Sequence, residues 1–396
     1  MDHSHNGLKP RILLLGSQMT TGGAQRVLLD QADWLHQHGY PVEVAFLYDR
    51  DGLQDRWQTG RDFPILNLRF RSLQASGLQN ALSFMGGLFR LFRLMRRRKY
   101  QVIETFTHHS NLIGCLLGWA AGIPVRIASH HGSIERMPVW VNRLHSWMVN
   151  WGFADKLVVV SLDVLRQSKE EGINPKRLVI IPNGVPDVDR NSQNAAKIRE
   201  EILSDHSGVL ILSIGRLTYQ KAHTYLLKAF STVLKQHPNS LTALAGEGPL
   251  LGDLETEANE LGIRNKVRFL GVRSDIPDLL TASDFFVLSS RWEGMPLVLL
   301  EAMRAGIPIA ATDVHGIREA LDDGKCGLIV PTEDPAALAD AMLRLIHEPE
   351  LAKQLGQAAR RRFEQHYTLQ KMMEGYMALL DPSSAGQVEG GIRKIA

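Results

Sequence analysis

Two glutamates, Glu293 and Glu301, lie eight residues apart in the segment RWEGMPLVLLEAMRA (291–305). On a single helix their side chains would point about 80° apart around the axis, a poor arrangement for sharing one ligand. Gly294 instead favours a turn, and Pro296 suits a first helical position, where its missing N–H costs nothing. We therefore expect Glu293 in a loop at the mouth of a helix and Glu301 inside that helix. A helix start with free N–H groups favours an anionic ligand, here one that also carries hydroxyl groups.

Two cations, Arg216 and Lys221, follow the apolar run VLILSIG (209–215) with four residues between them. Fixed cations at a strand end could stabilise the negative charge that develops on a departing phosphate, without a metal ion. Gly22 and Gly23 precede the helical stretch AQRVLLDQADWL, where backbone N–H groups could approach a diphosphate. The alternatives at these positions are two solvated surface charges and a plain loop with a helix cap.

These motifs resemble those of the retaining glycosyltransferases with the GT-B fold that form the large family 4 group. The spacing of Glu293 and Glu301 is similar to the family's E-x7-E motif. Four more segments resemble family motifs in the family's order: a glycine-rich loop and first helix at 20–35, an inter-domain segment at 181–185, an Arg-and-Lys diphosphate motif at 213–230, and a closing strand and helix at 327–342. One departure is Ala222, because the family usually has glycine after the lysine.

The resemblance implies a role for each charged residue. Arg216 and Lys221 would stabilise the diphosphate that leaves the donor sugar, and Glu301 would accept hydrogen bonds from the two ribose hydroxyls. Glu293 would lie beside the transferred sugar. The other residues that the resemblance assigns to donor binding are Gly22, Gly23, Gly246, Gly248, Val272, Arg273, Gly294, Met295, Pro296 and Leu297.

Two pairs of adjacent histidines also follow predicted strands. Family members carry a functional histidine that faces the donor sugar, and either His130 or His131 could be this residue. Adjacent side chains on a strand point to opposite faces, so only one of the two can serve. Alignment on the following glycine favours His131, and a structural, hydrogen-bonded histidine is the alternative. His108 and His109 could line the acceptor site; neither pair has an evident carboxylate or cysteine partner, so we expect no metal site.

Short apolar runs that alternate with amphipathic stretches must position these residues. Strands are expected at 11–16, 41–48, 100–106, 125–131, 156–161 and 178–184, and again at 209–215, 239–246, 267–271, 285–290, 308–312 and 327–330. Buried runs separated by helices predict parallel sheets covered on both faces. We expect two Rossmann-like α/β domains facing across a cleft. Residues 1–185 would bind the acceptor and 186–365 the nucleotide-sugar, while in the family the helix within 366–396 crosses back to the first domain.

The candidate residues follow strands, and open parallel sheets bind ligands beyond the carboxyl ends of their strands. A single Rossmann dehydrogenase would place its ligand there too, but it needs G-x-G-x-x-G after the first strand. The sequence GSQMTTGGAQR does not fit this pattern, which disfavours NAD.

Composition narrows the class of protein further. The 396 residues are 44% hydrophobic, enough for two cores, and two cysteines are too few for a disulfide framework.

The segment LSFMGGLFRLFRLMRRRKY (82–100) combines Phe84, Leu88, Leu91 and Met95 at helical spacing with a cluster of basic residues. It is either a helix that touches an anionic membrane or a packed helix with a solvated basic end. Nucleic acid is disfavoured because no aromatic-interleaved basic groove occurs.

The resemblance thus implies a metal-independent, retaining glycosyltransferase of polysaccharide or lipopolysaccharide biosynthesis. It would use a UDP- or GDP-linked sugar, no cofactor, and a glycan or lipid-linked acceptor. With no apparent signal peptide or membrane span, it would be cytoplasmic, and peripheral on the inner face of the cell membrane if the basic segment 82–100 touches lipid. The alternatives are an epimerase or phosphorylase on the same fold and a non-catalytic nucleotide-sugar-binding subunit.

Overall fold

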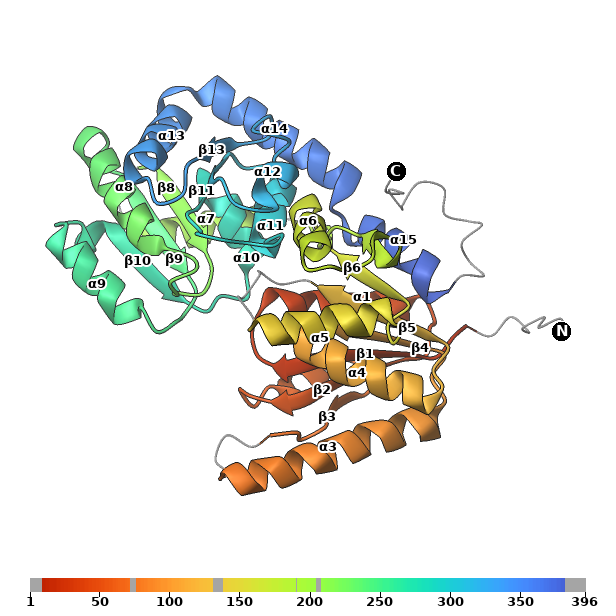
Figure 1. Cartoon of the computed structure of the whole chain (residues 1–396). Helices are drawn as coiled ribbons and strands as arrows, with labels where there is room; N and C mark the ends of the chain where they lie inside the picture. Colours follow the sequence, from red (N-terminus) through yellow and green to blue (C-terminus); the bar gives the residue numbers. More distant parts are fainter. Residues whose placement is uncertain (1–8, 72–75, 131–137, 190, 204–207, 382–396) are drawn as a thin grey trace. The chain divides into compact units, whose positions relative to one another are not determined.

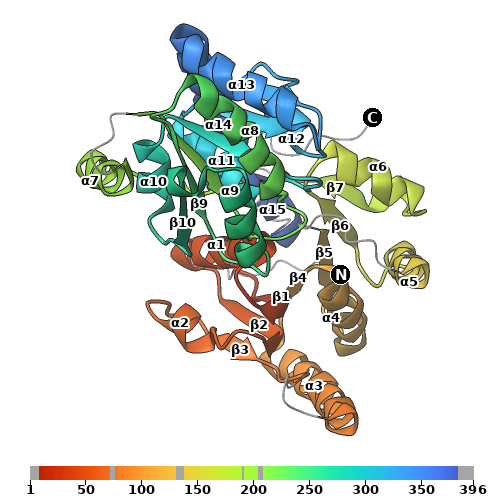
Figure 2. The same cartoon turned by 90° about the vertical axis from the view of Figure 1, so that its left-hand side faces the viewer.

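The computed structural model divides the chain into two compact units. The first comprises Met1–Gly184 and Leu369–Ala396, and the second comprises Val185–Thr368. Each unit has one parallel sheet with helices packed on it (Figures 1 and 2). The prediction of two Rossmann-like α/β domains is therefore confirmed. The structure describes residues 9–71, 76–130, 138–189, 191–203 and 208–381.

The sheet of the first unit has seven parallel strands in the order β3-β2-β1-β4-β5-β6-β7. They are β1 (Ile12–Met19), β2 (Val42–Asp49), β3 (Ile65–Asn67), β4 (Val102–Phe106), β5 (Val125–His130), β6 (Lys156–Val159) and β7 (Leu178–Ile180). The sequence predicted all of these except β3, which has three residues and pairs with β2 at the edge of the sheet. Such a short run carries too few residues to show a pattern.

Helices cover both faces of this sheet. The helices are α1 (Gly23–Gln37), α2 (Gln54–Gln58), α3 (Gly77–Arg98), α4 (His108–Ala121), α5 (Val139–Asn150), α6 (Leu162–Glu170) and α15 (Leu369–Leu380). Strands are added in one direction from β1 to β3 and in the other from β4 to β7, so right-handed crossovers put the two series of helices on opposite faces. As a result α1 packs beside α15, while α3, α4 and α5 lie next to one another (Figures 1 and 2).

The sheet of the second unit has six parallel strands in the order β10-β9-β8-β11-β12-β13. They are β8 (Leu210–Ile214), β9 (Leu241–Ala245), β10 (Val267–Gly271), β11 (Phe285–Leu288), β12 (Ile309–Thr312) and β13 (Leu328–Val330). The strand order reverses between β8 and β11, which is the switch point where open α/β sheets bind ligands.

The helices of the second unit pack around this sheet. They are α7 (Ser192–Leu203), α8 (His223–Gln236), α9 (Leu251–Glu260), α10 (Ile276–Ala282), α11 (Leu297–Ala305), α12 (Ile317–Ala320), α13 (Pro335–His347) and α14 (Pro349–His366). Apolar side chains of α8, α9, α13 and α14 form one buried cluster with those of the strands. Of all the helices in the described part of the chain, none combines the length and the apolar character needed to cross a membrane.

A buried carboxyl group helps to attach α15 to the first unit. Glu104 of β4 accepts hydrogen bonds from the Gln31 Nε2 at 2.5 Å and from the Ser129 Oγ at 2.7 Å. The hydroxyl of Tyr376, on α15, is hydrogen-bonded to the same carboxyl group, and both residues are fully buried. Loss of water around this group raises the pKa of Glu104 from an ordinary value near 4.5 to about 8. Folding therefore favours the protonated form of this group.

We expect Glu104 to make the stability of the first unit depend on pH. A raised folded-state pKa stabilises the fold fully below about pH 4.5, and this contribution is lost as the pH rises towards 8. Glu104→Gln keeps a neutral hydrogen-bonding group and should abolish this decline between pH 5 and 8, as measured by thermal unfolding. Glu170→Gln, an exposed position on α6, is the matched control and should behave like the wild type. The same decline in wild type and in Glu104→Gln would contradict the assignment.

Candidate functional site

A buried ion pair lies at the switch point of the second sheet. The Lys221 Nζ is 2.5 Å from the Glu293 Oε1, and the two side chains are only 13% and 7% exposed. Lys221 belongs to the loop after β8, and Glu293 to the loop between β11 and α11. The Ser290 Oγ donates a second hydrogen bond to the same carboxylate oxygen at 2.6 Å. The structure thus brings together two predicted site residues that are far apart in the sequence.

The other predicted cation of this loop, Arg216, has an exposed side chain. Among the described residues it has no ion-pair partner, so its charge is available to a ligand. Lys221 by contrast folds back along the loop, since a Cβ on Gly215 would come within 3.2 Å of the Lys221 Cδ and Cε. One cation is therefore fixed by a carboxylate, and the other is left to solvent at the end of the same strand.

Arg291 connects the two loops that carry the ion pair. Its guanidinium lies 3.7 Å from the ring centroid of Tyr219 and donates to the Tyr219 carbonyl at 2.6 Å. Its backbone N–H donates to the Gln220 carbonyl at 2.8 Å, and the Ser289 Oγ donates to the Lys221 carbonyl at 3.0 Å. Sequence reasoning missed this role for Arg291. The only sequence signal was its position two residues before Glu293.

The helix that carries the second glutamate begins one residue later than predicted. Pro296 has an extended backbone, φ −72° and ψ 125°, and is the N-cap of α11, so Leu297 is the first helical residue. The Pro296 carbonyl accepts the hydrogen bond of the Leu299 N–H at 3.1 Å. Glu301 lies inside α11 and is 3% exposed. The two glutamates therefore sit as expected, one in the loop before the helix and one within it.

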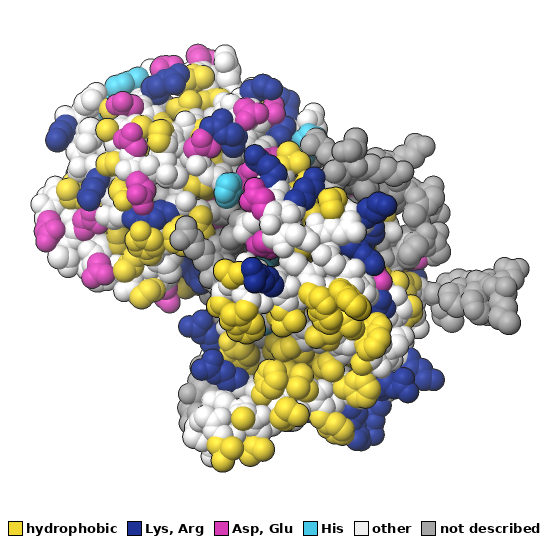
Figure 3. Space-filling model, viewed as in Figure 1, with side chains coloured by type: hydrophobic (Ala, Val, Ile, Leu, Met, Phe, Trp, Pro, Cys, Tyr) yellow, Lys and Arg dark blue, Asp and Glu magenta, His cyan; other side chains and the backbone are white. Residues whose placement is uncertain are grey.

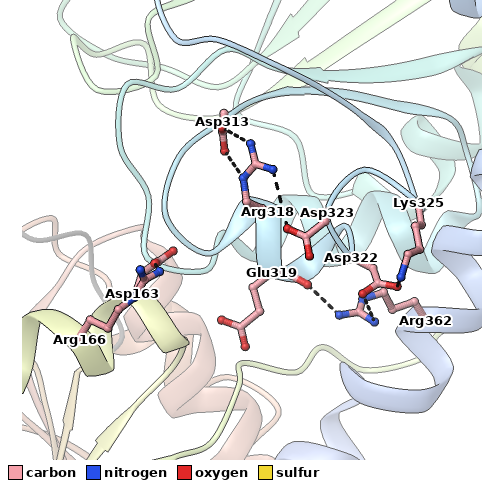
Figure 4. Close-up of polar contacts among 9 residues, drawn as sticks. All are labelled: Asp163, Arg166, Asp313, Arg318, Glu319, Asp322, Asp323, Lys325 and Arg362. Atoms are coloured by element: carbon pink, nitrogen blue, oxygen red, sulfur yellow. Dashed lines mark hydrogen bonds and ion pairs between the residues drawn. The ribbon is translucent and has the colours of Figure 1, made fainter.

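The loop after β12 packs against the turn at Gly294. A Cβ on Gly316 would come within 1.8 Å of the Gly294 carbonyl oxygen, so only glycine fits at position 316. Two arginines hold this segment, because Arg318 forms an ion pair with Asp313 and Arg362 of α14 lies 3.6 Å from Asp322 (Figure 4). Figure 4 also shows Lys325 paired with Asp322. The turn that precedes α11 thus rests on a segment fixed by charge pairs.

Two predicted donor-binding glycines have a packing role. Gly246 has a φ of +144°, and a Cβ there would lie 2.1 Å from the Gly215 carbonyl oxygen. A Cβ on Gly248 would lie 2.2 Å from the Leu217 carbonyl oxygen. The loops after β8 and β9 therefore touch backbone to backbone, which is sufficient to explain glycine at both positions.

The two residues predicted near the base differ in their environment. The side chain of Val272 is 55% exposed. The guanidinium of Arg273 instead forms two hydrogen bonds with the carboxylate of Asp275, at 2.8 and 2.6 Å. The Arg273 side chain therefore already has a partner. The predicted contact with the nucleotide base involves backbone atoms, so it does not need the Arg273 side chain.

The predicted glycines of the first unit and its histidines His108, His109 and His130 lie at carboxyl ends of its strands. Gly22 is the N-cap of α1 and Gly23 its first residue. Gly22 has a φ of −173°, which any residue can adopt, so its conformation does not require glycine. His109 is exposed at the start of α4, and His131 lies outside the described residues.

The other two histidines belong to a buried cluster. The ring of His108 lies 4.5 Å from that of His130 and 4.9 Å from that of His145, between centroids. Burial lowers the pKa of His108 to about 4 and that of His145 to about 3, so both are neutral near pH 7. Sequence reasoning missed His145, which lies on α5 away from any strand end. In the described part of the chain, no three His, Cys, Asp or Glu side chains are arranged to hold a metal ion.

Two family models match consecutive parts of the chain. Residues 21–189 match Glycosyltransferase Family 4, and residues 194–362 match Glycosyl transferases group 1. The gap between the matches lies close to Val185, where the second compact unit begins. Each unit thus has its own family match.

Individual relatives and a solved structure agree with these matches. The chain is similar to UDP-Gal:alpha-D-GlcNAc-diphosphoundecaprenol alpha-1,3-galactosyltransferase of Escherichia coli, with 28% identity over 67% of this chain and 72% of that protein. It is also similar to the putative glycosyltransferase EpsF of Bacillus subtilis, with 26% identity over 81% of this chain and 83% of that protein. The crystal structure of Anabaena HepE in complex with UDP has a similar fold, with a TM-score of 0.80, 20% identity, and coverage of 94% of this chain and 100% of that chain.

The site loop contains one residue whose substitution should stabilise the second unit. Ala222 adopts the left-handed conformation, φ 51° and ψ 39°, at the N-cap of α8. A residue with a Cβ is disfavoured there by about 1–2 kcal/mol, whereas glycine adopts it freely at a smaller entropic cost. We expect Ala222→Gly to raise the free energy of unfolding by about 0.5–1 kcal/mol in urea denaturation. Ala358→Gly, within α14, is the control and should lower it by about 1 kcal/mol. A destabilised Ala222→Gly variant would show that strain is absent.

Proposed function

The chain belongs to the GT-B glycosyltransferases of the group 1 and family 4 type, and from this premise we propose that it transfers a sugar from a nucleotide-sugar to a lipid-linked glycan acceptor. The observation that supports this proposal most directly is the ion pair of Lys221 with Glu293 at the switch point, with the exposed Arg216 on the same loop. Two cations and a carboxylate at this place suit a ligand that carries both phosphates and sugar hydroxyls.

In the proposed reaction the two cations stabilise the leaving group. The bond between the anomeric carbon and the β-phosphate oxygen breaks, and the diphosphate takes the electron pair. Arg216 and Lys221 compensate this new negative charge, so the step needs no metal ion. Glu293 holds the Lys221 ammonium in position, while Glu301 accepts hydrogen bonds from the ribose hydroxyls.

We propose that the acceptor attacks from the face that the diphosphate leaves. The acceptor oxygen forms the new bond to the anomeric carbon, and its proton passes to the departing phosphate oxygen. Substitution on this face retains the configuration of the sugar. No protein base is required, which agrees with a site whose buried carboxylate, Glu293, is already paired with a cation.

The relatives support a uridine nucleotide and a lipid-linked acceptor. The name of the E. coli relative contains UDP-Gal and a diphosphoundecaprenol acceptor, and HepE was crystallised with UDP. For this chain we therefore propose a UDP-linked sugar and an acceptor carried on a lipid diphosphate. We also propose that the enzyme works at the surface of an anionic membrane.

The basic end of α3 supports the proposed membrane association. Leu91 and Met95, which share the predicted apolar face, are buried in the core, and Phe84 packs on the edge of Phe70 with ring centroids 5.5 Å apart. Five basic residues at this end are exposed, namely Arg93, Arg96, Arg97, Arg98 and Lys99. Arg90, earlier on the helix, is held by two hydrogen bonds, because its guanidinium donates to the carbonyls of Leu68 and Arg69, each at 2.9 Å.

Replacement of Arg216 tests the leaving-group role without disturbing the core. We expect Arg216→Ala to lower kcat by about 10²–10³, because one charge-stabilising donor is lost, and to leave the unfolding temperature unchanged. Lys235→Ala, an exposed lysine near the end of α8, is the control and should keep full activity. Turnover of UDP-sugars should be measured with EDTA present, since the proposal involves no cation. An active Arg216→Ala variant, or loss of wild-type activity in EDTA, would contradict this proposal.

Charge reversal on α3 tests the membrane proposal. Each basic residue near an anionic surface contributes about 1 kcal/mol, and salt screens this attraction. We expect the triple variant Arg93→Glu, Arg96→Glu, Arg97→Glu to stop sedimenting with anionic vesicles at low salt; it spares Arg98, which lies 3.8 Å from Glu43. A control variant, Lys235→Glu on α8 with Lys353→Glu on α14, reverses two exposed lysines of the second unit and should sediment like the wild type. Equal sedimentation of the triple variant and the wild type would mean that the basic end is only solvated.

A further inference from the structure

Four of the seven tryptophans of the chain are exposed on one face of the first unit. We call this surface the tryptophan face and define it by Trp119 of α4, Trp140 and Trp147 of α5, and Trp151 directly after α5. Trp140 and Trp151 are 67% and 72% exposed. Figure 3 shows hydrophobic side chains gathered over α4 and α5. This amount of exposed aromatic surface is unusual for a protein that acts without a partner.

The tryptophan face is ordered by contacts among its own rings. Phe153 lies between two of the indoles, with its ring centroid 5.1 Å from that of Trp119 and 5.4 Å from that of Trp147. Trp147 also lies 5.6 Å from Trp151. The aromatic rings of α4 and of the end of α5 therefore form one continuous surface.

Helix α5 is apolar on two sides. Val141, Met148 and Val149 are buried against the unit. The exposed residues Trp140, Leu144, Trp147 and Trp151 recur at intervals of four, three and four, which places them on one side of the helix. The side with Val141, Met148 and Val149 packs on the core. Within the described residues, no element covers the side with the tryptophans, which stays exposed to solvent.

The helices α3, α4 and α5 carry basic side chains but no acidic ones. Between Asp62 and Asp155 the sequence contains only two acidic residues, Glu104 and Glu135, and α3, α4 and α5 contain none. Glu104 is fully buried in the sheet. On the opposite face of the sheet, α1 and α15 do carry acidic residues, so the absence is local.

Basic residues border the tryptophan face. The Arg96 guanidinium donates to the Ala121 carbonyl at 3.4 Å, which joins the basic end of α3 to the end of α4 that carries Trp119. Arg143 is exposed on α5. Aromatic rings on and beside helices that carry cations and no carboxylates match the interfacial region of an anionic bilayer, where indole rings sit at the level of the lipid headgroups.

We propose that the tryptophan face inserts into the headgroup region of an anionic lipid bilayer and provides the apolar part of membrane binding. The inference extends the proposed function, since a lipid-linked acceptor is presented at such a surface. The bilayer is favoured over a protein partner because all three helices on this side, α3, α4 and α5, lack acidic side chains while α3 carries a cluster of basic ones. The arginines of α3 would supply long-range attraction that salt screens, and the indoles would supply apolar contact that salt does not screen.

The two contributions can be separated with vesicles at low and high salt. Full-length wild type should bind vesicles of phosphatidylglycerol and phosphatidylcholine at low salt and keep a measurable part of this binding at roughly 0.5 M salt. The variant Trp140→Gln, Trp151→Gln should bind about tenfold or more weakly at low salt, since each indole removes a large apolar area from water, and not at all at high salt. Leu251→Gln, an exposed apolar residue on α9, is the control and should bind like the wild type.

Two further measurements, thermal unfolding and self-association, make the vesicle result decisive. Thermal unfolding should show the same midpoint for the double variant and the wild type, so weaker binding cannot be attributed to misfolding. Equal vesicle binding by the two proteins would overturn the inference. Concentration-dependent self-association of the wild type without lipid, abolished in the double variant, would also overturn it and identify the face as a protein interface.

The enzyme assay keeps this inference separate from the proposed function. With a water-soluble acceptor and no vesicles, the double variant should turn over UDP-sugar at the wild-type rate, because the tryptophan face does not touch the reacting atoms. If neither protein turns over any nucleotide-sugar, the proposed function is contradicted while the vesicle result stands by itself. Normal turnover with no vesicle binding by wild type would overturn the membrane inference and the proposed membrane association, while the proposed transfer reaction would stand.

Discussion

The ion pair between Lys221 and Glu293 is the contact on which the candidate site depends. Two charged groups that are almost withdrawn from water are tolerated only when their geometry is good and further hydrogen bonds satisfy them, and here Ser290 supplies one of these bonds. The parallel sheet makes the contact possible, because it brings the carboxyl ends of β8 and β11 side by side. Arg291 then fixes the two loops to each other. Without Glu293, the ammonium group of Lys221 in the loop after β8 would be left largely buried and without its carboxylate partner.

Close approach of backbone to backbone sets the shape around this pair. The loops after β8 and β9 meet at Gly246 and Gly248, and the segment before α12 meets the turn before α11 at Gly316. At each of these contacts a single methyl group would collide with a carbonyl oxygen. The glycines thus bring neighbouring loops of the second sheet close enough to form one surface, whether or not they also contact a ligand.

The alternation of apolar runs with amphipathic stretches was enough to predict both sheets, because the positions of the apolar residues show which parts of the chain are buried. β3 was not predicted, because a strand of three residues is too short to show an apolar pattern. Gly294 and Pro296 also predicted that Glu293 lies in a loop and Glu301 in the following helix. Arg291 and His145 could not be predicted in the same way, because their partners lie far away in the sequence and only the fold brings them together. The packing role of Gly246 was hidden for the same reason.

The return of α15 to the first unit has a consequence for synthesis. The second unit is inserted between Gly184 and Leu369, so the chain passes from one unit to the other twice. A ribosome therefore synthesises the whole second unit before it adds Tyr376, whose hydroxyl completes the buried network around Glu104. The first unit begins to emerge first but can be completed only last, and its unfinished surface must persist while the second unit already has every residue it needs to fold.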